Sequence, residues 1–211
     1  MAHGSLSLPA RLCLLAWDST EAEVTGAGRL PPLVRSGALV ELARRGLLTD
    51  EDGIATPADL DSETGDPVLD GLLELVRESR PHRWRTWVTL HARITLDAVR
   101  EQLAAGDHLR AEKRRVLGVF PTVEYVLERV DIVAALREEA RAALRGPVPV
   151  AEVSERDAAL AALADAAGLV SDDEPDRGRL EELVERGGAA PVLRTVLREV
   201  QTARTAASAV N

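Results

Sequence analysis

The chain of 211 residues is short of cysteine, lysine and aromatic residues: it has one cysteine, three tryptophans, one tyrosine and one phenylalanine, and Lys113 is its one lysine. Cys13 alone excludes an internal disulfide and a cysteine-rich zinc site, and favours a small core residue instead. The longest apolar runs fall far short of the roughly 20 residues that a membrane-spanning helix needs. Residues 1–18 combine an apolar stretch with neither a cationic start nor a small-residue cleavage site, so we expect a cytoplasmic protein without a secretory signal.

Enzyme motifs are also lacking. The sequence has no glycine-rich phosphate loop, no nucleophile elbow and no histidine–glutamate pair at zincin spacing. His82, His91 and His108 lie among arginines, an unfavourable setting for a catalytic base. Asp66 and Asp70 could form an acid/base or metal pair, but negative charge at the start of a helix explains them more simply. We therefore expect neither an enzyme nor a metal or cofactor site.

The charge is unevenly distributed. The net charge is −9, yet residues 80–115 hold nine basic and four acidic side chains, a local balance of +5 that leaves −14 for the remainder. An acidic protein with one basic segment suits contact with a polyanion through a single face, although a solvated helix surface would have the same composition. The abundance of arginine is by itself weak evidence for phosphate binding.

Apolar spacings of three and four residues predict a mostly helical chain. Residues 8–18 are apolar on most sides and fit either a buried helix or a strand. Gly46 is placed to end the helix before it, while either Thr64 or Asp66 could cap another helix and Pro67 suits its first position. The predicted helices cover residues 33–45, 67–79, 84–90, 95–105, 131–145, 154–169, 179–186 and 190–206.

Two hairpins and one linker complete this interpretation. Asp52-Gly53 predicts the bend of a small hairpin within residues 46–56, and a second hairpin within residues 109–125 has an apolar tip. Residues 146–150 have the composition of a linker. The fold predicted is mainly α: one helical domain spanning residues 1–211, with a small projecting β-hairpin.

Four segments, in this order, resemble the Golgi phosphoprotein 3 family, including its bacterial members. They are Gly37-Ala-Leu-Val-Glu-Leu-Ala-Arg-Arg-Gly-Leu47, Thr64-Gly-Asp-Pro-Val-Leu-Asp70, Arg80-Pro-His-Arg-Trp-Arg-Thr-Trp-Val88, and Val99-Arg-Glu-Gln-Leu103 followed by Arg114-Arg-Val-Leu-Gly-Val-Phe-Pro121. The first two are the most specific. The resemblance implies a helical domain with a projecting hairpin that binds phosphatidylinositol 4-phosphate at a membrane surface, and adaptors for membrane enzymes among the eukaryotic members.

The resemblance also implies a headgroup pocket, which this chain alters. The second-helix arginine of the family falls on Arg35, and the later of two paired arginines falls on Arg100. The earlier one falls on Asp97, and the family's tryptophan falls near Gly26 to Gly28. An aspartate repels the phosphate that an arginine would bind. Arg93 lies seven residues before Arg100 and would share its face on one helix, so it could supply the missing charge.

The second hairpin has a tip that suits a membrane. Leu117, Val119 and Phe120 could enter a bilayer while Arg114 and Arg115 lie at anionic headgroups, each cation contributing about 1 kcal/mol. Packing into the core or against a second copy of the chain would use the same residues.

Three functions compete. The first is a peripheral membrane protein, at the inner face of the membrane, that binds a phosphoinositide or phosphatidylinositol through Arg35, Arg100 and the tip. The second is an adaptor of the same fold that binds a client protein without lipid specificity. The third is a DNA-binding module, which the net charge and the acidic residues Asp97 and Glu101 disfavour, so we expect no nucleic-acid partner.

Overall fold

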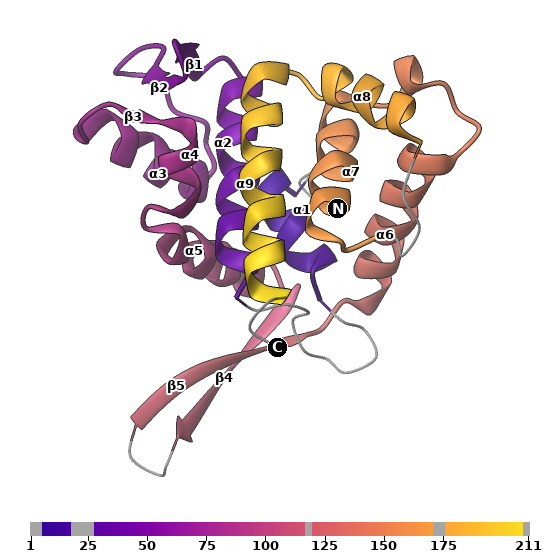
Figure 1. The fold of residues 1–211 in the computed structure, drawn as a ribbon. Coiled ribbons are helices and arrows are strands. Elements are labelled where there is room, and N and C mark those ends of the chain that lie inside the picture. Colours follow the sequence, from indigo (N-terminus) through magenta and orange to yellow (C-terminus); the bar gives the residue numbers. More distant parts are fainter. Residues whose placement is uncertain (1–5, 18–27, 117–119, 171–175, 209–211) are drawn as a thin grey trace.

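A computed structural model describes residues 6–17, 28–116, 120–170 and 176–208 of the chain. Helices dominate this part and two small antiparallel sheets accompany them (Figure 1). The helices are α1 (Leu8–Leu15), α2 (Leu30–Arg44), α3 (Pro67–Glu78), α4 (Trp84–Thr89), α5 (Ala92–Ala105), α6 (Val130–Arg145), η1 (Val150–Glu152), α7 (Glu155–Ala167), α8 (Arg177–Arg186) and α9 (Ala190–Ser208). The strands are β1 (Leu48–Glu51), β2 (Ile54–Pro57), β3 (His82–Arg83), β4 (Leu109–Val116) and β5 (Phe120–Leu127). The prediction of a mainly helical chain is confirmed.

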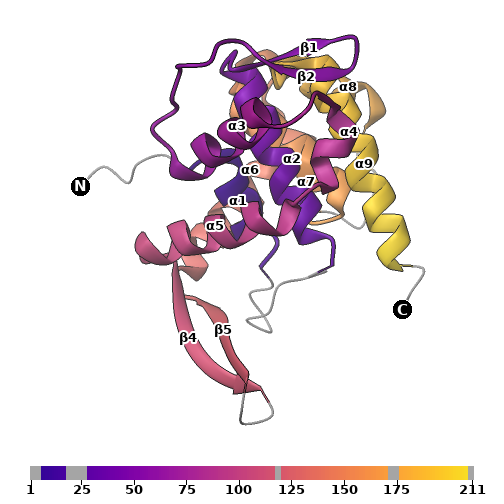
Figure 2. The ribbon, with the colours of Figure 1, turned by 90° about the vertical axis from the view of Figure 1, so that its left-hand side faces the viewer.

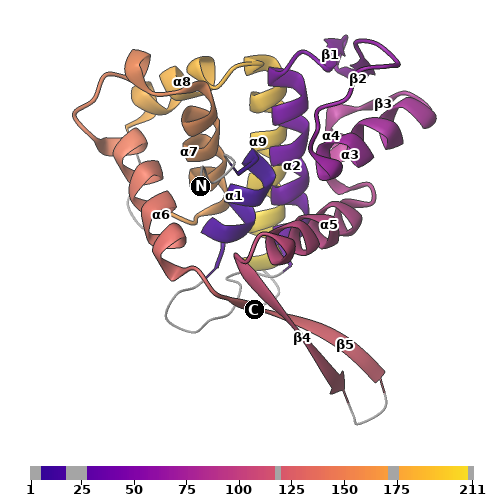
Figure 3. The same ribbon diagram turned by 180° about the vertical axis from the view of Figure 1, so that it is seen from behind.

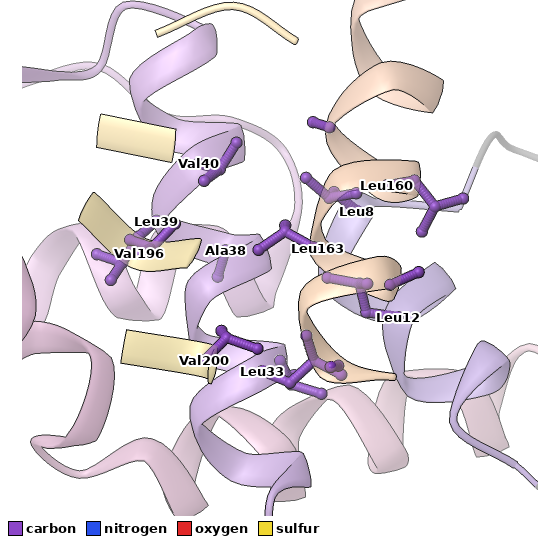
Figure 4. Packing of buried hydrophobic residues seen from close by; sticks show 14 of the residues in the cluster. Leu8, Leu12, Leu33, Ala38, Leu39, Val40, Leu160, Leu163, Val196 and Val200 are labelled. Carbon is purple, nitrogen blue, oxygen red and sulfur yellow. The ribbon is translucent and has the colours of Figure 1, made fainter. Parts of the chain in front are cut away.

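Helix α2 runs through the middle of the molecule, with α1, α7 and α9 packed around it (Figures 1 and 3). Figure 4 shows how side chains from these helices meet, among them Leu12, Ala38, Leu163 and Val196. A side chain at Gly37 would lie 2.5 Å from Leu12 Cδ1, so glycine is what allows α1 to approach α2 so closely. For residues 8–15 the open choice between helix and strand is settled, because they form α1 and nearly all of them are buried.

Local signals placed several elements correctly. The Asp66 carboxylate accepts hydrogen bonds from the Val68 and Leu69 amides and caps α3, as predicted. Asp70 accepts a hydrogen bond from the Thr64 amide at 2.6 Å, which leaves this aspartate pair a structural role. Asp52 and Gly53 both have positive φ angles, of 53° and 81°, as the tight turn between β1 and β2 requires.

Other boundaries differ from the prediction. Helix α5 begins at Ala92 rather than at residue 95, because Ala92 is buried and His91 has a left-handed φ of 54° that turns the chain sharply after α4. Residues 82 and 83 add a third strand, β3, to the first sheet, where a helix and its preceding loop alone were expected. Strand β3 consists of two residues, and an alternation of polar and apolar side chains cannot be recognised over so short a segment.

The second hairpin, β4–β5, projects away from the helices as a ribbon (Figures 1 and 2). Its base is attached, because Leu109 is buried against the core and Leu127 packs on it. Residues 146–149 connect α6 to η1, and Arg179 of α8 donates to the carbonyls of Ala143 and Val148 on either side of Gly146. The predicted linker is thus tied to α8.

Candidate functional site

Arg35 lies in the middle of α2 and its side chain is completely buried. Its Nη2 donates to the His91 carbonyl at 2.6 Å, whereas Nε and Nη1 have no hydrogen-bond partner among the described residues. Burial lowers the pKa of Arg35 to about 10. No acidic side chain forms a salt bridge with it in the part of the chain that the structure covers. Arg35 is therefore a buried cation whose remaining donors face no described acceptor.

The partner of Arg35 is an unusual piece of backbone. His91 links α4 to α5 in a left-handed conformation, which residues other than glycine seldom adopt. Its carbonyl accepts from the Ile94 amide as well as from Arg35. The start of α5 is thereby attached to α2 through one shared oxygen.

Arg93 and Arg100 both lie on α5, so the condition for them to share a helix face is met. Arg93 is exposed and Arg100 is half-buried. The Arg100 guanidinium lies 5.7 Å from the centre of the Tyr125 ring, and its Nε has no hydrogen-bond partner among the residues described. Arg100 also lies near α1, because α5 packs against α1 and the Arg100 charge acts on Cys13. Burial raises the pKa of Cys13 to about 12, and the Arg100 charge acts to lower it. Cys13 itself is buried, as predicted.

A further arginine was not predicted. Arg29 precedes the first turn of α2, and its Nε is buried without a hydrogen-bond partner in the described part of the chain. Arg29, Arg35 and Arg100 thus have buried donors without a described partner, as does Arg44 of α2, which lies beside Glu41. The proline pair Pro31-Pro32 suits the first turn of a helix. It was the available signal that α2 begins before residue 33 and places Arg29 at its N-terminus.

The remaining predicted site positions are Asp97, the altered tryptophan position and the hairpin tip. Asp97 is exposed on α5. Of the tryptophan position near Gly26 to Gly28, the structure describes Gly28 alone, and Leu117 and Val119 of the tip lie outside the described residues. The backbone places Arg114 and Arg115 in β4 and Phe120 in β5.

Glu41, a second buried charge on α2, is paired. Its Oε2 accepts from the Leu8 amide at 2.5 Å, and Oε1 accepts from Arg45 Nη2 at 2.6 Å and from Arg156 Nη2 at 3.3 Å. Arg44 Nη2 lies 3.6 Å away. Burial opposes ionisation of Glu41, but the Leu8 amide and these cations outweigh it and lower its pKa. The glutamate in the first resembling segment is therefore part of the framework, joining α1, α2 and α7.

Fold and site together define a helical domain with a buried, uncompensated cation and an external β-ribbon. The family model described as Golgi phosphoprotein 3 (GPP34) matches residues 8–200, and the chain belongs to this family. A search of curated proteins finds no match. No helix in the part described is long and apolar enough to cross a membrane. Across the described residues, no group of three or more histidine, cysteine or acidic side chains is placed to hold a metal ion.

Proposed function

We propose that this protein attaches to the inner face of a membrane by binding an anionic lipid headgroup, and that this lipid is phosphatidylinositol 4-phosphate, as the family resemblance implies. The observation that carries the proposal is Arg35, a fully buried guanidinium with one carbonyl as its hydrogen-bond partner and no carboxylate bound to it among the described residues. Family membership supports the same class of ligand.

Electrostatics explain why such an arginine favours an anion. The effective cost of burying an unpaired charge is several kcal/mol, and the lowered pKa of Arg35 reflects that cost. A phosphate placed against Nε and Nη1 would accept two parallel hydrogen bonds from the planar guanidinium and restore the pairing. Arg29 and Arg100, each with an unpartnered Nε in the described part of the chain, would add charge around the same ligand.

The exposed cations favour approach to a negative surface. Arg93 of α5 and Lys113 of β4 are exposed, and α5 and the ribbon lie together at one end of the molecule (Figures 1 and 2). Each such cation contributes about 1 kcal/mol near an anionic membrane, and salt weakens this contribution. Arg110 contributes less, because it binds Glu112 and Glu128. The tip, with Leu117, Val119 and Phe120, would add apolar contact.

Co-sedimentation with vesicles tests the proposal. The vesicles contain phosphatidylcholine alone, or with phosphatidylinositol, or with phosphatidylinositol 4-phosphate, each at low and physiological salt. We expect preference for the monophosphate that persists in salt and is lost in Arg35→Met. Arg177→Met, which removes an exposed arginine of α8, is the matched control and should bind like the wild type. If Arg35→Met sediments as the wild type does, Arg35 is not the headgroup ligand.

A second candidate function is an adaptor that binds a client protein. It is favoured by a groove of about 690 Å³ beside α8, lined by residues such as Val150, Ala151, Glu182 and Gly188. Glu181 and Glu185 at this groove are bound by Arg194, which reduces the charge available to a partner. Absence of binding to every vesicle would favour this function over the first.

A further inference from the structure

The base of the β4–β5 ribbon lies against Arg100, one of the candidate headgroup residues. Within the ribbon Leu109 is paired with Leu127, and Ala111 with Tyr125, so these residues share one face. Leu109 is buried, Tyr125 and Leu127 pack against the core, and Val123, two residues nearer the tip, is 49% exposed. Tyr125 therefore lies where the ribbon leaves the body of the protein.

At this point the Tyr125 ring meets Arg100. The guanidinium carbon lies 5.7 Å from the ring centre, within the range of a cation–π contact. Burial raises the pKa of Tyr125, and Glu101 and Asp97 act in the same direction against Arg100, so the phenol stays neutral at physiological pH. Arg100 is thus held by an aromatic face, a contact that uses none of its N–H donors.

We propose that Tyr125 is a positioning residue of the headgroup site: its ring orients the Arg100 guanidinium toward the lipid phosphate. This inference rests on the function proposed above. An arginine fixed by a carboxylate would give up the donors that phosphate needs, whereas stacking on a ring fixes the plane of the guanidinium and keeps the donors available. The single tyrosine of the chain therefore connects the ribbon to the ligand through Arg100.

Calorimetric titration with the water-soluble, deacylated headgroup of phosphatidylinositol 4-phosphate tests the inference. A soluble ligand removes any contribution from the tip, and Arg177→Met, an exposed change on α8, should bind it like the wild type. Tyr125→Leu should weaken binding about fivefold, the loss expected for one cation–π contact, and Tyr125→Phe should bind normally because it keeps the ring. Tyr125→Met, close to tyrosine in length and flexible, serves as the second ring-free variant if Tyr125→Leu melts early.

Arg100→Met separates failure of this inference from failure of the proposed function. We expect Arg100→Met to weaken binding, and Tyr125→Leu to cause no further loss in that background. If Arg100→Met and Arg35→Met both bind normally, the headgroup site is wrong and Tyr125 has no such role. If Arg100→Met weakens binding but Tyr125→Leu and Tyr125→Met do not, the site stands and the positioning role is refuted. A loss in Tyr125→Phe equal to that in Tyr125→Leu would assign the effect to the hydroxyl and also refute it.

Discussion

Two regions of α2 bury charges of opposite sign, and the two charges differ in how fully the protein pairs them. Arg35 and Glu41 are six residues apart on one helix, and both are completely buried. Glu41 is bound by a backbone amide, by Arg45 at the end of α2 and by an arginine of α7, whereas Arg35 has one carbonyl as its partner among the described residues. A charge that is saturated by the protein has a structural role, and a charge with unused donors is available to a ligand. The two residues should therefore respond in opposite ways to substitution.

Removing the Glu41 charge should have the largest effect. Glu41→Gln leaves buried or half-buried arginines without their anion, and breaking a buried ionic group typically costs about 3–5 kcal/mol of unfolding free energy. Urea denaturation followed by circular dichroism measures this loss. Glu182→Gln, at an exposed position on α8, is the control and should change the free energy of unfolding little. A loss in Glu41→Gln no larger than in this control would contradict the structural role.

The matching change at Arg35 should reverse the pattern. Arg35→Met removes an unpaired buried charge and keeps an apolar side chain of similar length, so we expect the free energy of unfolding to change by less than about 1 kcal/mol or to rise. Headgroup binding should fall by at least about tenfold, equal to 1.4 kcal/mol, because charged hydrogen bonds to phosphate are lost. The same urea titration and vesicle assay measure both quantities. Destabilisation as large as that in Glu41→Gln would show that Arg35 is structural too.

The pH dependence of stability should distinguish the two charges as well. The pKa of Glu41 is lower in the folded state than its ordinary value of 4.5, so its contribution is complete above that value and disappears as the pH falls below it. The pKa of Arg35 is lowered to about 10, so its burial penalty is present at neutral pH and is relieved as the pH rises past that value. Urea denaturation across pH gives the free energy of unfolding of each protein. Subtracting the value for Glu41→Gln, or for Arg35→Met, from that of the wild type gives the contribution of each charge as a function of pH. If the free energy of unfolding of a variant changes with pH as that of the wild type does, the role assigned to the substituted residue is contradicted.

Sequence patterns predicted the local features of this protein better than its buried charges. The Asp66 cap and the turn at Asp52 and Gly53 depend on neighbouring residues alone, so they were found. Two partners of Glu41, the Leu8 amide of α1 and Arg156 of α7, lie 33 and 115 residues away along the chain, and no local pattern reveals them. The family resemblance identified Arg35, but its burial follows from the central position of α2, which the spacing of apolar residues does not show.

Asp97 offers the smallest and most specific test of the comparison. It is exposed on α5 three residues before Arg100, at the position where the resemblance implies an arginine, and its carboxylate repels phosphate. Asp97→Arg should raise the affinity for vesicles with phosphatidylinositol 4-phosphate about fivefold, near 1 kcal/mol for one added charge at the surface. Glu101→Arg makes the same change in net charge one turn later on α5 and should give a smaller gain that salt abolishes. Because no described residue supplies an anion to the buried Arg35, a gain confined to Asp97→Arg and lost again on adding Arg35→Met would place both side chains on one ligand. Equal gains in the two single variants would instead show that the membrane responds to net charge alone.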